Sequence, residues 1–171
     1  GKSTLIQLLT GALARDAGTV RIDGREIAPR SIAEARAEGL SAVYQEVNLL
    51  ANMTVAQNLM LGREPLRWGV VRRAEMNRRA REMLAPYGLD IDVARDLGDH
   101  SVAVQQLVAI ARAVETKARV LILDEPTASL DAREVETLFG VMRELKRQGV
   151  GIVFVTHFLD QVYAVCDRIT V

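Results

Sequence analysis

The segment from Val120 to Asp131, which reads VLILDEPTASLD, constrains the fold of this chain more than any other. Its first four residues are apolar, and a short apolar run bounded by polar residues predicts a strand that is buried on both faces. Two adjacent carboxylates, Asp124 and Glu125, follow that run directly. Because ligands bind at the carboxyl edge of open parallel sheets, the sequence predicts a ligand site at the end of this strand.

The first four residues, GKST, match the end of the phosphate-binding pattern G-x-x-x-x-G-K-[ST]. We expect the first glycine of the pattern, and the strand before it, to precede residue 1. In this pattern backbone N–H groups cradle phosphates, Lys2 would reach the β- and γ-phosphate oxygens, and Ser3 would bind the metal. Apolar residues at helical spacing predict a helix over residues 2–13, whose N-terminus would face the phosphates. With Asp124 and Glu125, the pattern indicates a Mg²⁺–nucleotide site.

Composition narrows the class of protein. The chain has 171 residues, about half of them apolar, which is enough for one sizeable core. Its 22 basic residues equal its 22 acidic residues, so the whole-chain charge provides no field that would hold nucleic acid or an anionic membrane by electrostatics alone. A single cysteine, Cys166, allows no internal disulfide and suits a reducing compartment. We therefore expect a cytosolic protein that does not bind nucleic acid.

The order of the expected elements predicts an α/β fold. Strands are expected at residues 41–44, 119–123 and 152–156, with a last strand from about residue 168, and helices at 31–38, 132–147 and 159–166. Asp23-Gly24 predicts a hairpin turn between strands at 19–22 and 26–27. Strands that alternate with helices predict a mostly parallel sheet with helices on both faces.

The middle of the chain has a different character. Between residues 46 and 116 the sequence predicts no strand, only helices over residues 54–61, 72–87 and 101–116. The simplest interpretation is a helical subdomain, residues 46–116, inserted into an α/β core formed by residues 1–45 and 117–171.

Two further polar residues follow predicted strands. Gln45 comes after the strand at 41–44 and could reach a metal or a water with its amide. His157 comes after the apolar strand GIVFVT, so it should emerge at the same sheet edge as Glu125. Each residue alone is more typical of an ordinary surface or structural position. Their order along the chain favours a shared site.

These motifs resemble the nucleotide-binding domain of ABC ATPases, and the resemblance covers essentially the whole chain. The matching segments are Lys2-Ser3-Thr4 (Walker A), Gln45 (Q-loop), Ser101 with Gln105-Gln106 (signature), Val120–Glu125 (Walker B), Ser129–Asp131 (D-loop) and His157 (switch histidine). The implied fold is a P-loop NTPase core with an inserted helical subdomain, and the implied cofactors are ATP and Mg²⁺.

The resemblance also implies a role for each residue. Lys2 would hold the β- and γ-phosphates, with Gly1 and Thr4 also at the nucleotide, while Ser3 and Asp124 would hold Mg²⁺. Gln45 would contact the metal and the attacking water, Glu125 would be the general base, and His157 would contact the γ-phosphate. Ser101 and Asp131 would complete the nucleotide site between two ATPase halves. Such roles suit phosphoryl transfer, which depends on positioning and charge neutralisation.

The signature segment departs from the family pattern. Where LSGGQ is usual, this chain has HSVAV at His100–Val104, so two glycines are replaced by Val102 and Ala103. Glycines let the backbone approach a phosphate closely, and side chains in their place put the closed sandwich of two halves in question. The variation resembles bacterial sugar importers whose two ATPase halves lie in one polypeptide, and the VQQ spelling resembles galactofuranose-type importers.

The resemblance implies that the chain is most of the first ATPase half of such an importer. Its partners would be a second ATPase half, transmembrane permease subunits contacted near Gln45 and residues 46–64, and indirectly an extracellular sugar-binding protein. It would lie at the cytoplasmic face of the membrane. Two alternatives are a soluble ABC ATPase that acts on DNA or ribosomes, and a non-hydrolysing regulatory half. The first predicts long coiled-coil or basic insertions and the second predicts loss of Glu125 or His157.

Overall fold

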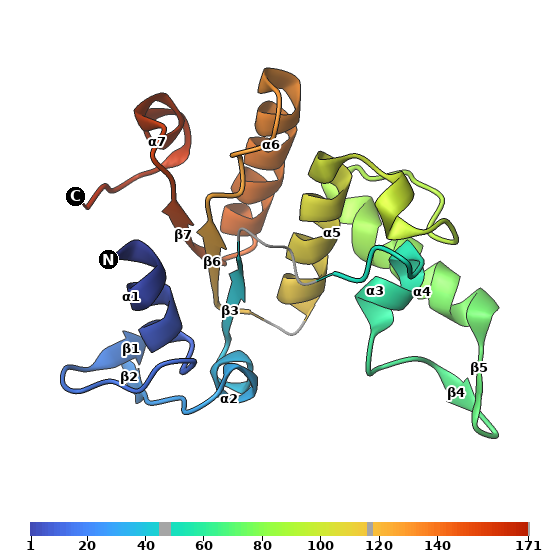
Figure 1. Ribbon diagram of the computed structural model, residues 1–171, viewed down its shortest axis with the longest axis horizontal. Helices are drawn as coiled ribbons and strands as arrows, with labels where there is room; N and C mark the ends of the chain where they lie inside the picture. The colour runs from blue at the N-terminus through green and yellow to red at the C-terminus, as the bar shows by residue number, and fades with distance from the viewer. Residues whose placement is uncertain (45–48, 116–117, 171) are drawn as a thin grey trace.

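The structure is a computed structural model that describes residues 1–44, 49–115 and 118–170. Helices and strands alternate at both ends of the chain, and helices predominate in between (Figure 1). In chain order, the α-helices, β-strands and 3-10 helices (η) are α1 (Lys2–Leu9), β1 (Val20–Ile22), β2 (Arg25–Ile27), α2 (Ile32–Ala37), β3 (Leu40–Val43), α3 (Val55–Met60), β4 (Leu66–Arg67), β5 (Val70–Val71), α4 (Arg73–Leu84), η1 (Ala85–Tyr87), η2 (Leu97–Asp99), α5 (Val102–Glu115), β6 (Val120–Asp124), α6 (Ala132–Arg147), β7 (Gly151–Val155) and α7 (Leu159–Val165).

A three-stranded parallel sheet with the order β3-β6-β7 forms the centre of the fold. Successive side chains of β6 point to opposite faces. Leu121 and Leu123 pack against α5 and α6 on one face, whereas Ile122 packs with residues of α1, α2 and the β1–β2 hairpin on the other. None of these three side chains is exposed to solvent. The parallel sheet covered on both faces confirms the predicted α/β class.

Helix α1 is shorter than predicted. It ends at Leu9 rather than Leu13, and Gly11 follows it with φ of 70°. A Cβ at Gly11 would lie 2.6 Å from the carbonyl oxygen of Pro29, so the chain turns there against the segment before α2. The helix buries Ile6 and leaves Leu5 56% exposed, so its buried face differs from the face that the leucine spacing indicated.

Helices α3, α4 and α5 pack into a second cluster, which we call the helical layer. Leu59, Leu84 and Val108 are fully buried in it. Buried Asn58 fixes the preceding segment, because its amide oxygen accepts from the Leu50 N–H at 2.8 Å and its amide nitrogen donates to the Leu50 carbonyl at 2.9 Å. These bonds satisfy a polar side chain that would otherwise destabilise the layer.

Helix α5 belongs to both clusters. Leu107 and Ile110 pack on the sheet side, and Val108 and Ala111 pack in the helical layer. The division into a core and a subdomain at residues 45/46 and 116/117 stays a prediction.

Two expectations about strands are wrong. Strands β4 and β5 form an antiparallel hairpin within residues 46–116, where only helices were predicted. Each strand is two residues long and the turn is Trp68-Gly69 rather than Asn-Gly or Asp-Gly, so the usual hairpin signals are absent. The last strand, expected from about Arg168, is absent from the described residues up to 170, where Ile169 is 49% exposed.

Among the described helices, none has the length and apolar character that crossing a bilayer requires.

Candidate functional site

Strands β6 and β7 end at the same level of the sheet. Asp124, the last residue of β6, is in register with Val155, the last residue of β7. The next backbone N–H, that of Glu125, donates to the Val155 carbonyl at 2.8 Å. The residues that follow the two strands, Glu125 and His157, therefore emerge at one carboxyl edge, as the sequence predicts.

Three charged or titratable side chains from separate elements meet at this edge. The Oε1 atom of Glu125 lies 3.4 Å from Nζ of Lys2, in the first turn of α1, and 3.4 Å from Nδ1 of His157. The Glu125 side chain is 23% exposed, and those of Lys2 and His157 are each 54% exposed. The carboxylate is thus the inner member of the group, with a donor on either side that solvent and ligands can reach.

The backbone fixes the direction of the Glu125 side chain. Its φ of 49° lies in the left-handed region, which costs a non-glycine residue about 1–2 kcal/mol. The following Pro126 disfavours the right-handed helical conformation at Glu125, and the N–H bond to β7 holds the turn in place. Backbone strain of this kind is concentrated at functional sites, because the surrounding structure must impose it.

The pKa values of the two adjacent carboxyl groups are shifted in opposite directions. Burial raises the pKa of Asp124, the charge of Glu125 adds to the rise, and Lys2 acts against it. The hydrogen bond from His157 lowers the pKa of Glu125, and Lys2 lowers it further. Neighbouring carboxylates whose pKa values are pushed apart are typical of sites in which the groups have different tasks. Glu125 is held as a carboxylate that can accept a proton, while the desolvated Asp124 would be stabilised by a cation.

The start of α1 can bind an anion. Gly1 occupies its N-cap without a side-chain hydrogen bond, and the first helical backbone bond is from the Leu5 N–H to the Gly1 carbonyl at 3.1 Å. The N–H groups of residues 2–4 have no backbone acceptor in the part of the chain that the structure describes. Unpaired N–H groups and the positive end of the helix dipole attract phosphate oxygens. Ser3 and Thr4 are exposed in this turn.

Ser3 and Asp124 fit the donor set of Mg²⁺. Within the described ranges, no group of three or more His, Cys, Asp or Glu side chains is placed to hold a metal ion by itself. Mg²⁺ does not need such a cage, since it commonly binds one or two protein oxygens together with substrate phosphates and water. Gln45, the third predicted ligand, lies outside the described residues.

The structure does not bring Ser101 to this group. Its hydroxyl accepts the Val104 N–H at 3.4 Å at the exposed start of α5. Figure 1 shows the first turns of α5 and α1 on opposite sides of the three-stranded sheet. The helix that follows Ser101 and the helix that contains Lys2 therefore pack on different faces of the sheet.

Asp131 is the N-cap of α6. Its carboxylate accepts the Glu134 N–H at 2.8 Å, and the Glu134 carboxylate accepts the Asp131 N–H at 3.1 Å. This capping box gives Asp131 a structural task, whatever it does for a ligand.

The sequence interpretation missed residues that position the site. The Phe158 ring lies against His157, with ring centroids 4.0 Å apart, and the Phe158 N–H donates to the Thr156 hydroxyl at 3.1 Å. Thr127 is 3% exposed and donates to Gln161 of α7 at 2.6 Å, which ties the turn after Glu125 to the helix after His157. An aromatic residue directly after His157 was the available signal.

Comparisons with known proteins agree with this geometry. The family model described as ABC transporter matches residues 1–128. The galactofuranose transporter ATP-binding protein of Escherichia coli is 58% identical over 171 residues, and a ribose import ATP-binding protein of Rubrobacter xylanophilus is 50% identical over 171 residues. Each alignment covers 100% of this chain and 34% of the relative, so the chain spans about a third of the length of these curated relatives.

Solved structures show the same fold. A nucleotide-free ATP-binding cassette from an ABC transporter superposes with a TM-score of 0.82 at 29% identity, over 98% of this chain and 70% of that chain. An ATP-binding cassette of an ABC transporter in its ADP conformation gives the same TM-score and identity, with the same coverage of the two chains.

Proposed function

The chain belongs to the ABC transporter family, and on this premise we propose that it binds and hydrolyses ATP, with Mg²⁺ as cofactor, to energise the import of a sugar. The observation that carries the proposal is the meeting of Lys2 and His157 on Glu125 at the carboxyl edge of the sheet. Carboxylate, ammonium and imidazole groups at one edge suit phosphoryl transfer to water, which depends on positioning and on neutralisation of charge. The retention of Glu125 and His157 argues against a non-hydrolysing half.

Each residue of the site has a proposed task. The first turn of α1, with Gly1 and Thr4, binds the phosphates, and Lys2 neutralises their charge. Glu125 accepts the proton of the attacking water, a task for which its carboxyl group must be ionised. His157 contacts the γ-phosphate, held in place by Phe158.

Ser3, Asp124 and Gln45 would hold Mg²⁺, which when bound offsets phosphate charge. Burial of Asp124 makes its carboxylate costly to leave without a cation, and this supports its assignment as a ligand. Ser101 and Asp131 are assigned to the nucleotide site shared with a second ATPase half. The start of α5 lies across the sheet from the start of α1 (Figure 1), and this supports a site in trans.

The proposed partners follow from the family and the relatives. Proteins named as galactofuranose and ribose import components align along the whole chain, which supports a sugar-import system with a second ATPase half, permease subunits and an extracellular sugar-binding protein. We assign the chain to the cytoplasmic face of the membrane, with a core of residues 1–45 and 117–171 and a helical subdomain of residues 46–116.

A cavity beside the end of β3 is a suitable contact for the permease. It has a volume of about 320 Å³, and we call it the docking cavity. Tyr44, Leu61 and the guanidinium-bearing residues Arg36, Arg63 and Arg112 line it, whereas none of the catalytic candidates Lys2, Glu125 and His157 does. Burial lowers the pKa of Arg112, and the charges of Arg36 and Arg63 lower it further. A cavity in which like charges are gathered favours an acidic partner segment.

The test is a pair of variants in the full-length protein. Glu125→Gln removes the base but keeps size and hydrogen-bonding capacity, so we expect steady-state ATP hydrolysis to fall about 10²–10⁴-fold while nucleotide affinity is retained. Lys2→Ala should instead weaken nucleotide binding, because it deletes the cation facing the phosphates. Equal loss of nucleotide affinity in both variants, measured by calorimetry, would refute this division of tasks.

A further inference from the structure

The β4–β5 hairpin presents apolar side chains to solvent. Leu66 is 62% exposed, Trp68 is 91% exposed and Val70 is 69% exposed. The register pairs Leu66 with Val71 and Arg67 with Val70, so both faces of the ribbon carry an aliphatic side chain. At its base the Arg72 N–H donates to the Pro65 carbonyl at 2.8 Å, which closes the hairpin. Such a cluster of exposed apolar side chains marks an interaction site more often than a single exposed residue does.

Trp68, at the tip of the hairpin, has an unfavourable backbone conformation and an exposed side chain. It is the single tryptophan of the 171-residue sequence and has φ of 55°, in the left-handed region where a bulky side chain is an outlier. A two-residue hairpin turn of this kind usually takes Asn-Gly or Asp-Gly. At 91% exposure the ring gains almost nothing from burial within the chain. The strain and the exposure together indicate that the ring contacts something outside the chain.

The segment around the hairpin is strongly basic. Residues 63–82 contain seven arginines and three glutamates, a net charge of +4, although the whole chain is neutral. The charge balance of the complete sequence therefore conceals a local basic field. Such a field acts on a partner within about 8–10 Å at physiological ionic strength.

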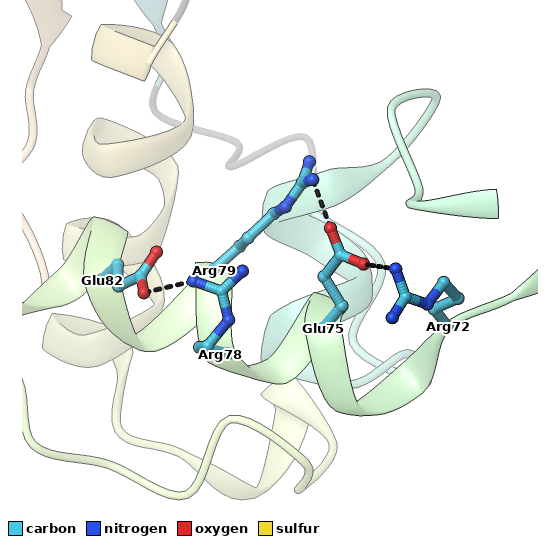
Figure 2. Close-up of polar contacts among 5 residues, drawn as sticks. All are labelled: Arg72, Glu75, Arg78, Arg79 and Glu82. Carbon is cyan, nitrogen blue, oxygen red and sulfur yellow. Dashed lines mark hydrogen bonds and ion pairs between the residues drawn. The ribbon is translucent and has the colours of Figure 1, made fainter. Parts of the chain in front are cut away.

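Two of the three glutamates of this segment are engaged along helix α4, as Figure 2 shows, and the third, Glu64, accepts the Gly62 N–H. Glu75 forms ion pairs with Arg72 and Arg79, and Glu82 pairs with Arg78 at 2.6 Å. In the part of the chain that the structure describes, Arg67 and Arg73 have no ion pair. Both are exposed, one on β4 and one at the first residue of α4. The hairpin thus carries unneutralised positive charge next to its apolar side chains.

We propose that the β4–β5 hairpin contacts the surface of an anionic membrane, with Trp68 at the level of the lipid headgroups and Arg67 and Arg73 against lipid phosphates. Tryptophan prefers the membrane–water interface because its ring is apolar and its N–H is polar. Arginines beside it are attracted to anionic lipid, as in other interfacial segments. An acidic protein surface would account for the arginines alone, whereas the membrane interface accounts for both the arginines and the exposed Trp68.

The position of the hairpin is consistent with this contact, and this step depends on the proposed function. Arg63 lines the docking cavity, and β4 begins three residues later at Leu66. A permease bound at the docking cavity would leave the hairpin beside it, on the side of the chain that faces the bilayer. The membrane contact would then help to orient the ATPase domain under its permease.

Flotation of the full-length protein with lipid vesicles tests the proposal. Vesicles of phosphatidylcholine with phosphatidylglycerol should carry more protein than vesicles of phosphatidylcholine alone, and added salt should reduce the difference. Trp68→Ala should lower the partition coefficient at least about tenfold. Arg67→Ala and Arg73→Ala should each lower it about fivefold.

Matched controls distinguish the hairpin from a general surface effect. Tyr163→Ala removes another aromatic side chain that is 74% exposed, and Arg21→Ala removes another exposed arginine. Neither change should alter flotation. ATP hydrolysis in solution should be unchanged in all five variants, since none touches the sheet edge. Hydrolysis that is absent even in the unmodified protein would refute the proposed function without affecting the flotation result.

Two outcomes would overturn the membrane contact. In one, Trp68→Ala floats as well as Tyr163→Ala. In the other, Trp68→Ala weakens assembly with the permease in detergent but leaves vesicle binding intact, which would assign the hairpin to a protein partner. Binding of a nucleic acid probe in place of vesicles, lost in Arg67→Ala, would also refute it.

Discussion

At the carboxyl edge of the sheet, Lys2, Glu125 and His157 come from three elements far apart in the sequence and meet around one carboxylate. Along α4 in the helical layer, by contrast, Glu75 and Glu82 pair with arginines three or four residues away in the same region of chain. The first arrangement exists only when the sheet is formed. The second forms wherever the helix does, and each such pair contributes only about 0.3–0.5 kcal/mol. The candidate catalytic group therefore depends on the complete fold, whereas the ion pairs of α4 depend only on the helix and change stability little.

The largest effect that we expect is a loss of stability, and it shows whether the sheet and the helical layer unfold independently. Leu121 of β6 and Leu59 of α3 are both fully buried, and replacing either with Ala should cost about 2–5 kcal/mol. Because α5 packs in both clusters, we expect Leu59→Ala to increase hydrogen exchange in β6 as well as in α3. Hydrogen–deuterium exchange with mass spectrometry on the full-length protein measures both regions together.

If Leu59→Ala increased exchange in α3 and α4 alone, the helical layer would be a separate cooperative unit. Nucleotide affinity is the second readout. Leu121→Ala should reduce it because the strand delivers Asp124 and Glu125, and Leu59→Ala should leave it nearly unchanged at temperatures where the protein is folded.

The start of α1, at Lys2, and the start of α5, at Ser101, should affect nucleotide binding and hydrolysis differently. Ser101→Arg places a bulky side chain at the exposed start of α5. We expect ATP binding at the Lys2 site to be retained and steady-state hydrolysis to fall at least about tenfold, because α5 would serve the partner half. Occlusion of nucleotide, counted separately at the two sites of the full-length protein, is the measurement. Loss of occlusion at the Lys2 site with the partner's site intact would show that Ser101 acts within its own half.

Loss of either of two capping boxes, one in the helical layer and one on a helix that covers the sheet, should have a smaller effect on stability. Thr54 caps α3 and Asp131 caps α6, each with a return bond from the residue three positions later. Thr54→Ala and Asp131→Ala should each cost about 1 kcal/mol of stability. Asp131→Asn keeps the cap and serves as the control. A loss of ATP hydrolysis in Asp131→Asn at full stability would show that Asp131 has a task at the ligand beyond capping.

The smallest effect is a pH dependence. The pKa of Glu125 in the folded protein lies below its ordinary value of 4.5, chiefly because of the hydrogen bond from His157. A lowered folded-state pKa contributes stability that is fully present above 4.5 and is lost as the pH falls through the folded value. In His157→Ala the Glu125 pKa should rise toward 4.5, as a carboxyl carbon titration by NMR would show. An unchanged pKa in this variant would mean that Lys2 alone lowers the pKa of Glu125. Lys2→Ala is the matching control.

The residues with strong local signals could be predicted from the sequence. Helix α6 has the predicted bounds, 132–147, because Asp131 caps its start and its amphipathic pattern is regular. The parallel arrangement of β6 and β7 followed from their apolar runs, and this placed Glu125 and His157 at one edge. The left-handed backbone of Glu125 and the Thr127–Gln161 bond could not be predicted, since both depend on contacts between distant segments. The hairpin at Trp68 was missed because its turn lacks the usual residues.

The sharing of α5 between two clusters limits how this fold can be recombined. Its apolar surface nearly surrounds the helix, with Leu107 and Ile110 facing one cluster and Val108 and Ala111 facing the other. A chimera that takes residues 46–116 from a relative would import the interface of α5 with α3 and α4 whole, but only the α5 half of its interface with the sheet and α6. Substitutions on this helix must therefore be compatible with two sets of neighbours at once, and overpacking against either set typically costs about 1–3 kcal/mol. Successful grafts would carry the facing residues of β3, β6 and α6 together with the helix.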